Sequence, residues 1–120
     1  MNLSTFARTA VLSAAALLAA PAALADPGAG CHFHGSKPAA EATVVGCATQ
    51  YKDKLVAGNK VEKSWQAVIK PEKVEQIDGK KGKEWRLTFR NPAATDKAKE
   101  SLYLFYTLPG NFIAANHTGQ

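Results

Sequence analysis

The first 25 residues most limit what this chain can fold into, because they have the three parts of an export signal. Arg8 makes the N-terminal region positive, residues 11–20 are a run of Val, Leu, Ala and one Ser, and Ala23-Leu24-Ala25 is a small-x-small cleavage pattern. Such a short apolar run cannot cross a bilayer core of about 30 Å. We therefore expect cleavage after Ala25, no transmembrane segment, and a periplasmic or secreted mature protein.

A second cleavage pattern lies just beyond the first. Ala29-Gly30-Cys31 resembles the end of a lipoprotein signal, in which the cysteine is acylated and anchors the protein to a membrane. Gly28 stands where a Leu is usual, and the apolar run ends too early for this signal. We therefore favour the cut after Ala25 and keep lipidation of Cys31 as the alternative.

Removal of the export signal leaves about 95 residues, enough for one small domain with a single core. We predict a flexible N-terminal arm over 26–37 and one domain over 38–120. All 10 acidic residues and all but one of the 15 basic residues lie after residue 25, which leaves a net charge of +4. These charges are interspersed, as on a solvated surface, and nucleic acid is not an expected partner outside the cytoplasm.

Apolar residues recur at three- and four-residue steps after the arm, which predicts one amphipathic helix over 38–57. The residues of this stripe are Val44, Cys47, Ala48, Tyr51 and Leu55. Ser36 is the candidate N-cap, and Pro38 suits the first turn. Gly58-Asn59 is a typical helix end.

The chain after the helix predicts about four antiparallel strands. The segments are 64–69 with a continuation over 74–77 beyond Pro71, 84–90, 101–108 and 112–115. The second strand alternates cleanly and places Trp85, Leu87 and Phe89 on one face. The third has apolar residues on both sides and should be central. One helix on such a sheet is an α+β fold.

A single helix covers only one face of the sheet, so the other face should be partly wet unless it meets a partner. Tyr103 and Phe105 lie on the opposite side of the third strand from Leu102. We therefore expect these two aromatic residues on the uncovered face.

Several short motifs in combination resemble an uncharacterised family of small exported bacterial proteins. They are Leu55-Val56-Ala57-Gly58, Ser64-Trp65, Trp-x-x-x-Phe-x-Asn over 85–91, Leu102-Tyr103-Leu104-Phe105 and Ala-Ala-Asn-x-Thr-Gly over 114–119. The resemblance implies an exported protein with an architecture similar to PepSY-type domains and no assigned activity. It also implies a His-rich stretch after the signal, reduced here to residues 31–35, and an aromatic residue where this chain has His117.

Cys31 and Cys47 are the only cysteines in the chain. An even number in an exported protein favours a disulfide, which would close a loop of about 16 residues. Cys47 also lies on the apolar helix stripe, where a free thiol packs as a small hydrophobe. Cys31 has two histidine neighbours. Two free thiols, or a metal bound by Cys31, therefore stay open as alternatives.

Cys31, His32 and His34 form the one dense group of metal-ligand side chains in the sequence, and thiolate and imidazole suit Cu, Zn or Ni. A closed zinc site needs four ligands, and His117 is the nearest candidate for the fourth. The alternative is a solvated arm whose histidines bind nothing specific.

Catalytic motifs give no support for an enzyme, since the sequence has no Gly-x-Ser-x-Gly or His-Glu-x-x-His pattern and only three histidines. We therefore expect a non-enzymatic periplasmic module that binds an envelope protein or a small ligand through the uncovered sheet face. The alternative is a metal-binding accessory protein that uses Cys31, His32 and His34.

Overall fold

The described part of the chain is residues 31–120 of a computed structural model. In chain order the elements are α1 (Glu41–Ala57), the 3-10 helix η1 (Lys63–Ala67), β1 (Lys73–Gly79), β2 (Gly82–Arg90), the 3-10 helix η2 (Lys97–Lys99), β3 (Ser101–Thr107) and β4 (Phe112–Asn116). The predicted export signal and its cleavage site lie outside these residues. Within 31–120, no helix has both the length and the apolar character that a membrane crossing requires.

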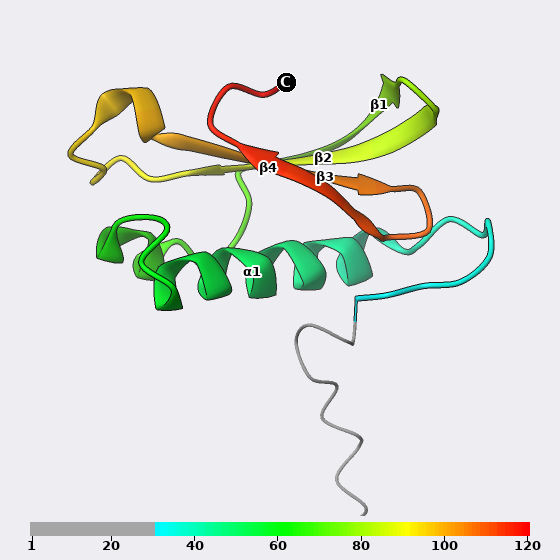
Figure 1. Ribbon diagram of the computed structural model, residues 1–120, viewed down its shortest axis with the longest axis horizontal. Helices are drawn as coiled ribbons and strands as arrows, with labels where there is room; N and C mark the ends of the chain where they lie inside the picture. Colours follow the sequence, from blue (N-terminus) through cyan, green and yellow to red (C-terminus); the bar gives the residue numbers. More distant parts are fainter. Residues whose placement is uncertain (1–30) are drawn as a thin grey trace, which may run out of the picture.

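The four strands form one sheet in the order β1-β2-β3-β4, with antiparallel pairing throughout. Figure 1 shows α1 running along one face of this sheet. The predicted α+β fold is therefore confirmed, with the third strand in a central position. The hairpin between β1 and β2 turns through Lys80-Lys81, between the paired residues Gly79 and Gly82. Gly82 has a φ of 127°, which L side chains rarely adopt.

The sheet face that meets α1 carries the core. Trp85, Leu87 and Phe89 are 6%, 0% and 0% exposed, as the alternation of the second strand predicts. The other buried members of the cluster come from α1, η1 and β3: Val44, Cys47, Ala48, Trp65, Leu102, Leu104 and Tyr106. Each fully buried large apolar side chain contributes roughly 1.5–3 kcal/mol, so this single layer is the main source of stability.

The helix starts later than predicted and ends where predicted. Its N-cap is Ala40, which offers no side-chain cap, so Ser36 is not the cap. The chain stays extended before Ala40 because the Ala39 N–H donates to the Leu108 carbonyl oxygen at 2.8 Å. At the other end, the Gly58 N–H caps the Lys54 carbonyl at 2.9 Å.

The strand predicted over 64–69 is wrong, because this segment begins with η1. Trp65, Ala67 and Ile69 alternate in the sequence as they would in a strand, yet Trp65 is 1% exposed and Ile69 is 75% exposed. The turn is closed by two backbone bonds, Trp65 N to Glu62 O at 3.0 Å and Val68 N to Trp65 O at 3.1 Å. Burial of a single large side chain thus decides the local structure here.

Lys52 of α1 holds η1 in place. Its side chain is 1% exposed, and its Nζ donates to the Trp65 carbonyl oxygen at 3.1 Å and to Asp53 Oδ1 at 2.6 Å. Lysine is rarely buried to this extent unless its ammonium is paired. The Lys52 stem therefore packs as a core side chain while its ammonium joins α1 to η1.

Residues 31–37, the described part of the predicted N-terminal arm, make several contacts with the rest of the domain. Cys31 and Cys47 form the predicted disulfide, with their Cα atoms 5.7 Å apart. The Phe33 N–H donates to Asn111 Oδ1 at 2.7 Å, and Asn111 Nδ2 donates to the Phe33 carbonyl at 2.8 Å. The Phe33 ring also approaches Gly110, where a Cβ atom would lie 3.0 Å from the ring. The arm is thus fixed both to α1 and to the β3–β4 turn.

Substitution of Lys52 tests this buried contact. Because Lys52→Ala deletes a fully buried stem, we expect it to lower the free energy of unfolding by about 2–4 kcal/mol. Lys52→Met keeps the stem and should recover part of that loss. The matched control Lys54→Ala, at an exposed position of the same helix, should change stability by less than about 0.5 kcal/mol. Urea denaturation measures all three, and a Lys52→Ala loss no larger than that of Lys54→Ala would show that the stem is not part of the core.

Candidate functional site

The sheet face opposite α1 is less open than predicted. Phe105 is only 6% exposed, and Tyr103 is half-buried. Figure 1 shows the C-terminal residues curling over this face. A Cβ atom built on Gly119 would lie 3.4 Å from the Tyr103 ring, so the tail rests against that ring. The two aromatic residues predicted to bind a partner are thus largely covered by the chain itself.

An ion pair lies beside Phe105 on the same face. Phe105 pairs with Arg86 across β2 and with Ala114 across β4. Arg86 Nε donates to Glu75 Oε2 at 3.1 Å, and this hydrogen bond from Arg86 holds the pKa of Glu75 below its usual value despite partial burial. The face therefore presents a charged pair next to Phe105 instead of an open apolar surface.

The predicted metal ligands are only partly brought together. His32 and His34 are exposed, and their ring centroids lie 5.0 Å apart in an edge-to-face arrangement. The Cys31 sulfur is bonded to Cys47 and is not a thiolate ligand while the disulfide is intact. Among residues 31–120, no three His, Cys, Asp or Glu residues are grouped so that they could hold a metal ion. His117 instead lies in a separate pocket.

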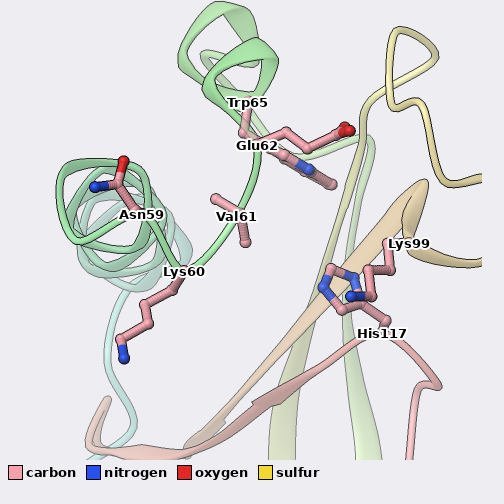
Figure 2. Close-up of a pocket in the computed structure, with 7 residues that line it drawn as sticks. All are labelled: Asn59, Lys60, Val61, Glu62, Trp65, Lys99 and His117. Atoms are coloured by element: carbon pink, nitrogen blue, oxygen red, sulfur yellow. The ribbon is translucent and has the colours of Figure 1, made fainter.

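That pocket, here called the end pocket, has a volume of about 300 Å³ and lies just beyond the C-terminal end of α1. It is lined by Asn59, Lys60, Val61, Glu62, Trp65, Lys99 and His117. Three parts of the chain thus meet there: the segment from α1 to η1, the end of η2 and the residue after β4. In Figure 2 the Asn59 and Lys60 side chains point away from the space, whereas Val61 and Trp65 face His117 and Lys99 across it.

Trp65 brings an unpaired hydrogen-bond donor to the end pocket. The other tryptophan, Trp85, donates its indole N–H to the Leu108 carbonyl at 3.1 Å. Trp65 Nε1 has no acceptor among residues 31–120, and no fully buried side-chain nitrogen or oxygen there lacks a partner. The small accessible part of Trp65 therefore includes its indole N–H, and Trp65 is one of the residues that line the pocket.

His117 stands across the pocket in a fixed tautomer. Its Nδ1 lies 2.7 Å from the Ser101 carbonyl oxygen. A carbonyl can only accept, so Nδ1 carries the proton and Nε2 remains for a ligand. The His117 and Trp65 rings are tilted by 50° with centroids 6.5 Å apart. Because β4 ends at Asn116, the position of His117 follows directly from the β3–β4 pairing.

The acidic side chain at the end pocket has hydrogen-bond partners, whereas the basic side chains form no ion pair within residues 31–120. Glu62 accepts hydrogen bonds from the Thr95 hydroxyl and from the Thr95 N–H, the latter at 3.1 Å to Oε2. These bonds, the hydroxyl first, keep the pKa of Glu62 below its usual value. Lys60 and Lys99 form no ion pair within the described residues. Because the Lys60 side chain points away from the space in Figure 2, the pocket has one ammonium without an ion-pair partner, that of Lys99, and one carboxylate that is already engaged.

Sequence reasoning missed the end pocket. Ser64-Trp65 and the motif around His117 both stood out as local patterns, but they lie far apart in the chain. Trp65 and His117 come together because of η1 and the end of β4. A strand was predicted where η1 lies, so this contact could not be foreseen. Only the resemblance to a family flagged both segments as worth attention.

Comparison with known proteins identifies the family but no activity. A family model described as a family of unknown function, DUF6488, matches residues 2–120. No curated protein and no solved structure matches the chain. The expected membership of an uncharacterised family is confirmed. The similarity to PepSY-type domains stays a prediction.

Titration of Glu62 tests the local geometry of the end pocket. The Glu62 pKa is lower in the folded than in the unfolded chain, so its contact with Thr95 stabilises the fold above the unfolded pKa and is lost as the pH falls through the folded pKa. We expect Thr95→Val to raise the Glu62 pKa toward its usual value in an NMR titration. Asp78, whose pKa is lowered by Lys83, is the internal control and should not change. An unchanged Glu62 pKa in the variant would contradict the assigned contact.

Proposed function

The chain belongs to the DUF6488 family of unknown function, and we propose that it is an exported, non-enzymatic module that binds a small ligand in the end pocket. One observation carries this proposal: a tryptophan that is 1% exposed keeps its indole N–H free at the wall of a concave site. An accessible indole N–H can donate to a ligand, and ligand sites are typically apolar hollows with a few such polar groups.

Export is supported by two independent features. The sequence pattern of residues 1–25 is that of a cleaved signal, with its expected cut after Ala25. The disulfide between Cys31 and Cys47 is of the kind that persists in oxidising compartments such as the periplasm. Together they favour a periplasmic or secreted location for this module.

Binding is favoured over catalysis by how the polar groups are used. A general base is normally oriented by a third group, often a carboxylate. In the end pocket, His117 Nδ1 is held by the Ser101 carbonyl, whereas Glu62 is occupied by Thr95. The lining residues include no serine, threonine or cysteine nucleophile. We therefore assign no reaction to the site.

The end pocket is a better candidate than the uncovered sheet face. On that face Phe105 is buried, and the tail rests on Tyr103. A ligand would have to displace the C-terminal residues to reach these rings. The end pocket requires no such rearrangement, because its space is already formed between the two layers.

A fragment screen by two-dimensional NMR on the labelled protein tests this proposal. We expect fragments that bind to shift the signals of Val61, Trp65 and His117 and to leave those of Tyr103 and Phe105 unchanged. A thermal-shift assay with the same fragments should show stabilisation that grows with ligand concentration. Shifts confined to Tyr103 and Phe105 would show that the ligand binds on the sheet face and not in the end pocket. A screen without any binder would contradict the proposed function.

A further inference from the structure

We infer that the ligand of the end pocket is a small organic carboxylate. This inference rests on the proposed function and adds the chemical class of the ligand. Three features of the pocket favour a carboxylate: the balance of charge, the hydrogen-bond donors that remain free and the apolar part of the wall.

The balance of charge favours an anion. Lys99 lines the pocket without an ion-pair partner in residues 31–120, whereas the Lys60 ammonium points away from the space. The only acidic lining residue, Glu62, already accepts hydrogen bonds from Thr95. Figure 2 shows the Glu62 carboxylate turned away from His117. A ligand with one negative charge would therefore meet more positive than negative charge.

The free donors match the acceptor geometry of a carboxylate. The Trp65 indole N–H comes from one wall, and Lys99 comes from the His117 side of the pocket. An ionised carboxylate has two oxygens that only accept, so one oxygen can take the indole N–H and the other the ammonium. Hydrogen bonds with a charged partner are roughly twice as strong as neutral ones.

The remaining wall favours an organic acid over inorganic phosphate. Trp65 and Val61 provide apolar surface, which a hydrocarbon group on the ligand would cover. The C-terminal end of α1 adjoins the pocket, and this end of a helix carries partial negative charge. A doubly charged phosphate suits such a place less well than a singly charged carboxylate. The volume of about 300 Å³ limits the ligand to a small molecule.

The test compares three probes with the same ring: benzoate, benzyl alcohol and benzylamine, with acetate as a smaller acid. Each is titrated into the labelled protein at neutral pH and low salt. We expect benzoate to shift the Trp65 indole signal and the His117 ring signals to saturation. The Trp85 indole, which is bonded to Leu108, serves as the internal control and should not move. Benzylamine should not bind.

Variants at two lysines check the role of charge. Because Lys99→Met removes an ammonium but keeps an unbranched side chain, we expect it to weaken benzoate binding about fivefold to tenfold. Lys80→Met removes another exposed lysine, in the β1–β2 turn outside the pocket, and should leave the affinity unchanged.

Three outcomes would overturn the carboxylate inference. Equal binding of benzyl alcohol and benzoate would show that charge is not recognised, while the pocket itself would stand as a ligand site. Equal losses of affinity in Lys99→Met and Lys80→Met would show that the attraction is a general effect of net charge. Failure of both benzoate and acetate to shift the Trp65 signal would exclude small carboxylates, and the fragment screen then decides whether the pocket binds anything else.

Discussion

The contact between the Lys52 ammonium and the Trp65 carbonyl oxygen is the interaction on which the site depends. A nearly fully buried lysine stem reaches from α1 to the following 3-10 helix and joins two segments that are 13 residues apart. With η1 anchored in this way, the Trp65 ring packs into the core and also lines the end pocket. Lys52 thus supports both the core and the candidate site, and a substitution that displaces η1 should disturb both.

The two ends of α1 are fixed by different means. At its N-terminal half, the disulfide from Cys47 and the two bonds of Asn111 to Phe33 hold the arm against the helix and the β3–β4 turn. At its C-terminal end no disulfide joins the helix to another element in the described residues, and the end pocket lies there. The segment in which we expected metal ligands is thus held at one end of α1, and the end pocket lies at the other.

The alternation of apolar residues predicted correctly those elements whose burial follows that alternation. The alternation of Trp85, Leu87 and Phe89 is enough to place β2 against the helix, because one face of an antiparallel sheet is buried as a unit. The same reasoning failed at Trp65, where an alternating pattern hides a 3-10 turn that is set by burial and by Lys52. It also gave no sign that Phe105 would be covered, since Arg86 and Ala114 are brought beside it only by strand pairing.

Hydrogen exchange of the two indole N–H groups tests most directly whether the Trp65 N–H is free to bind a ligand. Trp85 Nε1 donates to the Leu108 carbonyl, whereas Trp65 lines the end pocket and its Nε1 has no acceptor in the described chain. Two-dimensional NMR after transfer into D₂O resolves both signals. We expect the Trp65 indole proton to exchange clearly faster than that of Trp85. Equal or slower exchange at Trp65 would mean that this donor is paired or sealed, and the end pocket would lose the group on which its assignment rests.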